Sequence, residues 1–282
     1  MIAHIAGIIL CVLIFATTPA GAAEQPHTLP PYIMGIFPFV PTANIEGIFA
    51  PLAAEMSKAL DRPVKLKTAP SFEKFMDELK NQAFDFAYIQ PFDYVDIAKP
   101  AGYLPLASRN DTLSSHIVVK HDSPIKTLKE LKGKSLGMPP KVAAISFLNR
   151  IALKKAGLTP DTDVKMVFLA SHMACLQQLM IGTVDACGIS PAGVRLGERQ
   201  LKTTFHLIQE SPKIPTPLFV AHKKLPRKDR DIMLRVLTTT DLTGVKPELR
   251  VMFIESEQKA FRKTNDREYD VVRNIMKTYN IR

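Results

Sequence analysis

The residues best suited to chemistry lie in one stretch, 164–191, where an apolar run leads into Ser171 and His172. Ser171 is a preferred N-cap residue, so a helix is predicted to begin there, with His172 in its first turn. The free N–H groups and the positive dipole end of a helix can hold an anion. A single histidine at a helix start is more often an ordinary capping or surface residue, and both interpretations stand at this point.

Two cysteines in the same stretch allow more than one chemistry. Cys175 follows His172 by three residues, so a thiolate–imidazole pair could serve an enzyme, a soft metal or a thiophilic oxyanion. Cys187 lies on the next predicted strand, and a disulfide to Cys175 and two buried free thiols are both open. The spacing does not match a structural zinc site, which needs four ligands.

Catalytic motifs of the GxSxG, HExxH and P-loop types do not occur in the sequence. We therefore predict that the chain is not an enzyme, and we predict no metal and no cofactor. The formal net charge of +10 favours anionic partners. The basic residues are dispersed as pairs such as Lys154 and Lys155, without a basic block interleaved with aromatics, so nucleic-acid binding is not predicted.

Alternating strands and helices must position these side chains. Residues 32–102 show strand–helix alternation three times over. A similar set spans residues 116–191, with a capping box at 127–130 and a long helix from about 144 to 156. This alternation is typical of an α/β fold, in which helices cover both sides of a largely parallel sheet.

The C-terminal section supplies helices at 228–238 and 267–279 but no sheet of its own. Such a section must pack on another sheet, and the first lobe is its natural host. We therefore predict a discontinuous lobe 1, residues 24–115 plus 219–282, and a lobe 2, residues 116–218.

Residues 1–23 are predicted to be a secretory signal peptide. Residues 6–16 are uniformly small or apolar, and residues 20–23 form a small-residue cleavage pattern. The apolar run is too short to span a membrane comfortably, although an uncleaved N-terminal anchor is the alternative. Export from a bacterial cytoplasm would place the mature chain in the oxidising periplasm.

Several runs, taken in order and spacing, resemble one protein family over nearly the whole mature chain. The runs are Gly35, residues 50–52, 85–88, 117–120, 122–125, 128–134, Ser171 with His172, Leu179, Gly182, 184–186, 214–215 and 225–226. Together they resemble periplasmic solute-binding proteins of the phosphate/phosphite/phosphonate type, the receptor components of ABC importers.

The resemblance implies a type II periplasmic binding protein: two α/β lobes, crossover strands near 116–120 and 219–221, and a ligand cleft between the lobes. It also implies a monomer that delivers a small ligand, an oxyanion in the first place, to an ABC permease. His172 matches the family's ligand-contacting histidine. A receptor of the same fold that signals to a membrane histidine kinase is the alternative function.

The sequence departs from the family's pocket at several positions. Lys141 and three apolar residues replace a Ser/Thr-rich run before the long helix of lobe 2, and Phe72 replaces a pocket tyrosine. Ala192 and Pro217 stand near the positions of acidic residues that hold a ligand's amino group, so an aminoalkylphosphonate is not expected. The predicted ligand-binding residues are His172, Ser171, Lys141, Phe72, Tyr88 and Ser190.

Two of these residues also have ordinary explanations. Lys141 could be a solvated loop lysine, and Phe72 could be plain core packing. A more apolar site bordered by Phe72, Tyr88 and Phe37 would suit a ligand of another class.

Overall fold

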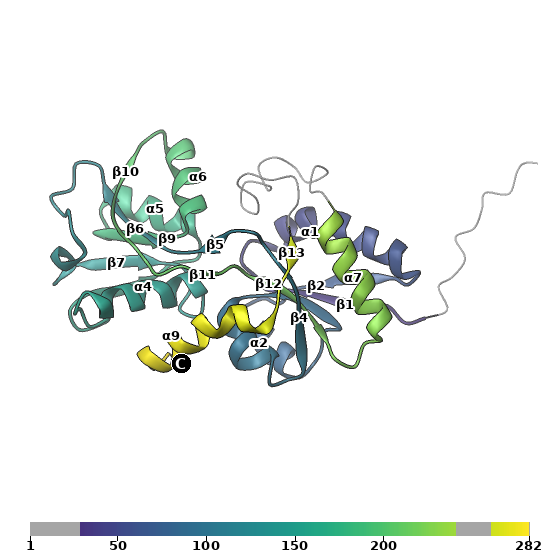
Figure 1. Ribbon diagram of the computed structural model, residues 1–282. Coiled ribbons are helices and arrows are strands. Elements are labelled where there is room, and N and C mark those ends of the chain that lie inside the picture. Colours follow the sequence, from purple (N-terminus) through teal and green to yellow (C-terminus); the bar gives the residue numbers. More distant parts are fainter. Residues whose placement is uncertain (1–28, 241–260, 282) are drawn as a thin grey trace, which may run out of the picture.

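The computed structural model describes residues 29–240 and 261–281, so the predicted signal peptide lies outside the described residues. The described elements form two lobes, each built on its own sheet (Figure 1). Each sheet is flanked by helices, which confirms the predicted two-lobed α/β fold.

Lobe 1 contains a six-stranded sheet. In spatial order its strands are β13 (Arg262–Lys263), β4 (Tyr103–Ser108), β12 (Leu218–His222), β3 (Phe86–Ile89), β1 (Tyr32–Ile36) and β2 (Val64–Lys67). Strand β1 pairs parallel with β2 and β3, whereas β12 runs antiparallel between β3 and β4. The sheet is therefore parallel in its N-terminal half and mixed where the C-terminal section inserts.

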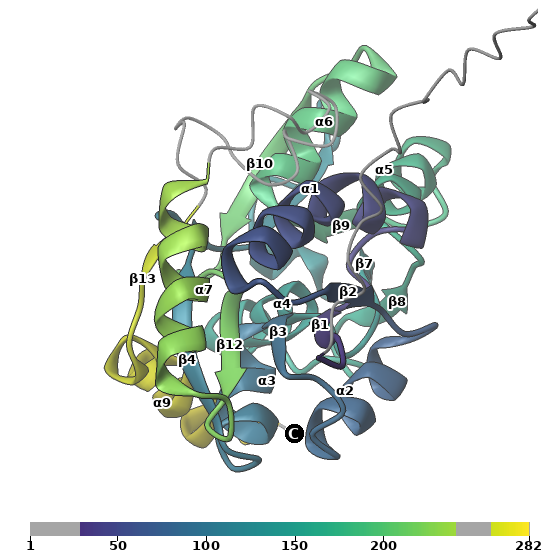
Figure 2. The same cartoon turned by 90° about the vertical axis from the view of Figure 1, so that its right-hand side faces the viewer.

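The helices of lobe 1 cover both faces of this sheet. They are α1 (Thr42–Leu60), α2 (Phe72–Lys80), α3 (Pro91–Asp93) continuing into a π-helix (Tyr94–Ala98), α7 (Arg227–Thr239), and a 3₁₀ turn (Asp266–Tyr269) leading into α9 (Asp270–Tyr279). Helices α1 and α7 pack side by side on one face, and α2 and α3 lie on the other (Figures 1 and 2). Strand β13 thus joins the lobe 1 sheet, whereas α9 runs from lobe 1 toward α4 of lobe 2 (Figure 1).

Lobe 2 contains a five-stranded sheet and three main helices. The strands, in spatial order, are β10 (Phe205–Glu210), β6 (His116–Lys120), β9 (Ala186–Ile189), β7 (Ser135–Met138) and β8 (Lys165–Phe168). The helices are α4 (Ala144–Lys155), α5 (His172–Ile181) and α6 (Pro191–Leu201), and a 3₁₀ turn (Leu128–Leu131) carries the predicted capping box. Strands β7, β8 and β9 are parallel, and β6 and β10 add antiparallel pairs.

Two short strands, β5 (Thr112–Leu113) and β11 (Ile214–Pro215), pair with each other and with neither large sheet. Residues 116–120 and 219–221, expected as the crossovers, instead lie inside the two large sheets as β6 and as part of β12. The segments that pass between the sheets are therefore β5 and β11, which come just before them. A run of apolar residues marks a strand, but it does not reveal which sheet the strand joins.

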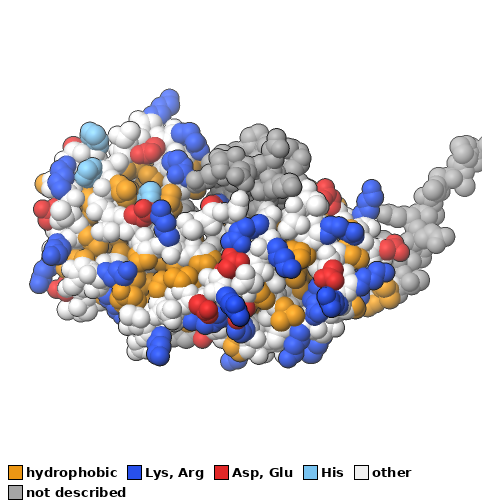
Figure 3. Space-filling model, viewed as in Figure 1, with side chains coloured by type: hydrophobic (Ala, Val, Ile, Leu, Met, Phe, Trp, Pro, Cys, Tyr) orange, Lys and Arg blue, Asp and Glu red, His pale blue; other side chains and the backbone are white. Residues whose placement is uncertain are grey.

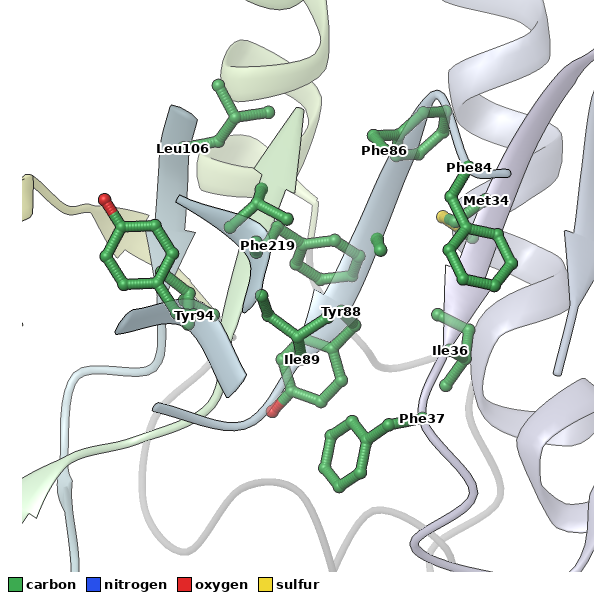
Figure 4. Packing of buried hydrophobic residues seen from close by; sticks show 14 of the residues in the cluster. Met34, Ile36, Phe37, Phe84, Phe86, Tyr88, Ile89, Tyr94, Leu106 and Phe219 are labelled. Atoms are coloured by element: carbon green, nitrogen blue, oxygen red, sulfur yellow. The ribbon is translucent and has the colours of Figure 1, made fainter. Parts of the chain in front are cut away.

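The lobes have different cores. The lobe 1 core is rich in aromatic side chains, among which Tyr88 packs against Phe219 and Phe37 with ring centroids 4.9 and 5.5 Å away (Figure 4). The lobe 2 core is divided by its sheet into two smaller clusters. The buried side chains Ile145, Leu148 and Ile151 of α4 are continuous with the lobe 1 core, so this helix of lobe 2 also contacts lobe 1.

Candidate functional site

Three helices of lobe 2 begin at one edge of its sheet. Helices α4, α5 and α6 follow β7, β8 and β9, which are parallel neighbours, so their N-termini gather where these strands end. Ligands of open α/β sheets bind at this edge, and helix N-termini there present N–H donors to anions. The starts of these helices are therefore the first place to look for a ligand.

His172 joins the starts of α5 and α6. Its Nδ1 accepts a hydrogen bond from the Ser190 backbone N–H at 3.3 Å, and the Ser190 Oγ lies 3.3 Å from the same nitrogen. A Cβ added at Gly193 would lie 2.8 Å from this Nδ1, so a glycine permits the close approach of α6. The two predicted site residues His172 and Ser190 are thus in direct contact.

Burial lowers the pKa of His172 from 6.5 to about 4, so the imidazole is neutral at pH 7. A neutral ring whose Nδ1 accepts a hydrogen bond carries its proton on Nε2. Nε2–H is then a donor without a positive charge. This chemistry suits the oxygen atoms of a ligand and does not suit a metal cluster or general-base catalysis at the same nitrogen.

Both serines predicted for the site cap helices. The Ser171 Oγ accepts a hydrogen bond from the Ala174 N–H at 3.1 Å, and the Ser190 Oγ accepts one from the Gly193 N–H at 3.1 Å. These caps confirm the predicted helix start at Ser171. The Ser171 hydroxyl hydrogen stays available to donate to a bound anion, whereas that of Ser190 is directed at the unprotonated Nδ1 of His172.

Cys175 and Cys187 are joined in a disulfide, with their Cα atoms 5.9 Å apart, and both side chains are fully buried. The bond ties α5 to β9, three residues after His172 and three residues before Ser190. It therefore fixes the two elements that place these side chains. Cys175 has no free thiolate, so the pair that an enzyme or a thiophilic ligand could use is not present in this form.

A residue that the sequence analysis did not single out reaches lobe 2 from lobe 1. Gln90, only 3% exposed, precedes α3, and its Oε1 accepts a hydrogen bond of 2.7 Å from the Ala144 N–H at the start of α4. Its Nε2 donates to the Val142 carbonyl at 3.3 Å and to Asp93 Oδ2 at 3.0 Å. In the sequence, Gln90 is a polar residue between a buried strand and a proline, and this pattern is too common to identify a site residue.

The remaining predicted site residues lie in different surroundings. Lys141 is exposed in the turn before α4. Phe72 is half-buried at the start of α2, with its ring centroid 6.0 Å from that of Phe37. Tyr88 is 2% exposed within the aromatic core, where burial raises the pKa of its hydroxyl and keeps it neutral. A ligand role for Lys141, Phe72 and Tyr88 stays a prediction.

Within residues 29–240 and 261–281, no group of three or more His, Cys, Asp or Glu side chains could hold a metal ion. None of the helices in these segments is both long and apolar enough to cross a membrane. Lys and Arg side chains are scattered over both lobes on the face shown in Figure 3.

The sequence matches one family model over residues 34–269, that of the family described as "ABC transporter, phosphonate, periplasmic substrate-binding protein". Among solved structures, PhnD1 from Prochlorococcus marinus in complex with methylphosphonate has a TM-score of 0.74 at 18% identity, over 89% of this chain and 98% of the other. A binding protein component of an ABC phosphonate transporter from Pseudomonas aeruginosa has a TM-score of 0.71 at 17% identity, over 87% and 85%. The aliphatic sulphonate binding protein SsuA from Escherichia coli has a TM-score of 0.58 at 14% identity, over 89% and 86%.

Proposed function

Since the chain belongs to the family of periplasmic substrate-binding proteins of phosphonate ABC transporters, we propose that it binds a phosphonate or a closely related oxyanion at the start of α5 and α6. Members of this family are binding components of transporters and not enzymes. The predicted transporter role agrees with this family, and the comparisons give no support to the alternative partner, a sensor kinase.

One observation carries the proposal: the hydrogen-bonded pair of His172 and Ser190 joins two helix N-termini. The N–H groups and dipoles of α5 and α6 favour a negative charge there. The Nε2–H of His172 and the hydroxyl group of Ser171 add donors of neutral character, and Ser190 holds the imidazole in the orientation that exposes Nε2. A phosphonate offers three oxygen acceptors, which this set of donors can satisfy.

Lobe 1 would supply the opposite wall of the site. Phe72 stands at the start of α2, and the Phe37 and Phe39 rings follow β1 with centroids 4.9 Å apart. Aromatic side chains suit the organic substituent of a phosphonate, and they carry no carboxylate that could form an ion pair with an amino group. This wall favours alkyl-substituted ligands, and it supports the expectation that aminoalkylphosphonates bind poorly.

We further propose that residues 1–23 export the chain, that the mature protein works as a monomer, and that it delivers its ligand to a membrane permease. The small-residue pattern at 20–23 supports the export signal. The buried disulfide suits an oxidising compartment.

A ligand screen tests the proposed function. The purified mature protein is titrated with methylphosphonate, phosphite, phosphate, sulfate and arsenite while its melting temperature is followed, because a tight ligand stabilises the folded state by mass action. We expect methylphosphonate or phosphite to raise the melting temperature. No shift with any of the five anions would overturn the proposed ligand class.

A matched pair of variants then tests the site. His172→Ala should weaken binding about 10-fold to 100-fold in isothermal titration, since one hydrogen bond to a charged ligand is lost. His121→Ala, at an exposed histidine of the same lobe, is the control and should bind as the wild type does. Equal affinity of the two variants would place the ligand elsewhere.

A further inference from the structure

The start of α4 differs from the starts of α5 and α6 in the source of its cap. Its N-cap residue is Ala143, which has no side chain that could accept a hydrogen bond. The first hydroxyl along the helix, that of Ser146, is fully buried and donates to the Pro139 carbonyl at 2.8 Å. Helix α4 therefore offers a bare N-terminus that its own sequence cannot cap.

Gln90 of lobe 1 fills this position. Its carboxamide accepts the Ala144 N–H at 2.7 Å and donates to the Val142 carbonyl at 3.3 Å, so both of its polar atoms are used at the same helix start. The side chain is 3% exposed, and its partner Asp93 is equally buried. Asp93 accepts the second hydrogen bond of the Gln90 Nε2 and so orients the carboxamide from the lobe 1 side.

The contact between the lobes around Gln90 is broad. The Phe92 ring on α3 packs against that of Phe147 on α4, with centroids 5.1 Å apart. At the other end of α4, Lys154 Nζ donates to the Tyr279 carbonyl at 2.8 Å. The Gln90 carboxamide thus lies within a contact between the lobes, where its three hydrogen bonds and its burial fix its orientation.

We propose that Gln90 determines the anion selectivity of this protein by occupying the first amide of α4, which confines the charged group of a ligand to the starts of α5 and α6. This inference rests on the proposed function, and it names Gln90 as the residue that restricts which helix starts the anion can reach. Because Gln90 accepts the Ala144 N–H, the site has one hydrogen-bond donor fewer for the anion. A ligand with three acceptor oxygens and an alkyl group then gains over inorganic phosphate, whose fourth oxygen finds no partner.

Alanine-specific ¹⁵N labelling tests this in the unaltered protein, because the chain has an alanine in the first turn of each helix: Ala144 in α4, Ala174 in α5 and Ala192 in α6. We expect methylphosphonate to shift the amide signal of Ala192 and to leave that of Ala144 nearly unchanged, while the signal of Ala174, whose N–H is bonded to the Ser171 Oγ, should change less than that of Ala192. A shift at Ala144 as large as that at Ala192, in a protein that binds the anion, would overturn the inference and leave the proposed function intact.

Variants test the selectivity directly. In Gln90→Ala the freed Ala144 N–H can bind a fourth oxygen, so the affinity ratio of phosphate to methylphosphonate should rise about 10-fold. Gln90→Met keeps the volume filled and should hold the ratio near that of the wild type. Gln200→Ala, at an exposed glutamine on α6, is the control.

An unchanged ratio in a folded Gln90→Ala protein would overturn the inference. If that variant does not fold, the alanine signals of the wild type decide alone. Absence of any anion binding by the wild type is a different outcome, since it overturns the proposed function itself and the inference with it.

Discussion

The two lobes repeat one frame with an offset of 100 residues, and they differ in what stands at equivalent places. Asp85 precedes β3 and accepts a backbone N–H from β1, and Asp185 precedes β9 and accepts one from β7. The second helix of each set then begins with Phe72 in lobe 1 and with His172 in lobe 2. The same frame therefore presents an apolar wall on one side and hydrogen-bond donors on the other.

The means of stabilising that frame differ as well. Phe75 of α2 stacks on Phe84 with ring centroids 4.9 Å apart, inside a large aromatic core. At the equivalent position of α5 stands Cys175, bonded to Cys187 within a small cluster. Lobe 1 therefore relies on packing at this position, whereas lobe 2 relies on a covalent link that ties α5, the helix that begins with His172, to β9.

The largest expected effect comes from removing the group that stabilises each lobe at this equivalent position. Phe75→Ala should lower the free energy of unfolding by about 3 to 5 kcal/mol, because it leaves a cavity in a packed core. The double variant Cys175→Ala, Cys187→Ala should cost about 2 to 4 kcal/mol, since the unfolded chain loses a cross-link. Guanidinium unfolding of both proteins measures the costs. Only the cysteine variant is also expected to bind methylphosphonate more weakly, and equal binding by both would contradict a positioning role for the disulfide.

The next largest effect is the contribution of His172 to the pH dependence of the free energy of unfolding. Because the folded-state pKa lies near 4 and the ordinary value is 6.5, the unfolded chain takes up a proton first as the pH falls. Stability from this group is complete above pH 6.5 and is lost between pH 6.5 and 4, by roughly 3 kcal/mol at most. His172→Phe, which copies the residue of lobe 1, should remove this part of the pH dependence.

The measurement is urea unfolding at several pH values between 7 and 4. Burial also lowers the pKa of His116 and His222, so the variant is compared with the wild type at each pH and not with a flat line. His121→Phe, at an exposed site, is the control. Identical slopes for His172→Phe and the wild type would contradict the neutral, partly buried imidazole.

A smaller effect compares the two aspartates. Asp185 Oδ2 accepts both the backbone N–H and the hydroxyl of Ser135, at 2.8 and 2.7 Å, whereas Asp85 Oδ2 accepts the N–H of Ile33 at 2.7 Å. Asp185→Ala should therefore cost about 2 to 3 kcal/mol and Asp85→Ala about 1.5 kcal/mol in urea unfolding. The opposite order would show that the two lobes do not use this anchor alike.

The smallest effect separates capping from ligand contact. The Oγ atoms of Ser71 and Ser171 each accept the N–H three residues on, at 3.2 and 3.1 Å. Either serine-to-alanine change should cost about 1 kcal/mol of stability. Only Ser171→Ala is expected to weaken methylphosphonate binding in titration calorimetry as well. If the two variants bind equally, Ser171 is a cap and nothing more.

Local signals explain which parts of the fold could be predicted. Ser71, Ser171 and the box at Thr127 and Glu130 act within one helical turn, and the structure places all of these caps where the sequence indicated them. Gly182 ends α5 in the left-handed conformation, with a φ of 82°, as glycine readily does.

Other elements lacked a local signal. Strand β4 contains Pro105, and α6 contains Gly193 and Gly197, which weaken the usual patterns of strands and helices. The antiparallel insertion of β12 depends on strands more than 100 residues away. Gln90 acts where one lobe packs on the other. The residues near it in the sequence form no pattern that would predict this contact.

The position of β12 has a consequence for the order of folding. All five strands of the lobe 2 sheet are present once the chain reaches Glu210, whereas β12, which fills the gap between β3 and β4, comes only afterwards. Lobe 2 can therefore complete its sheet while lobe 1 still has exposed strand edges. In pulsed hydrogen exchange during refolding we expect the amides of β7 and β9 to be protected before those of β3 and β4, because closing the longer loop in lobe 1 costs more entropy.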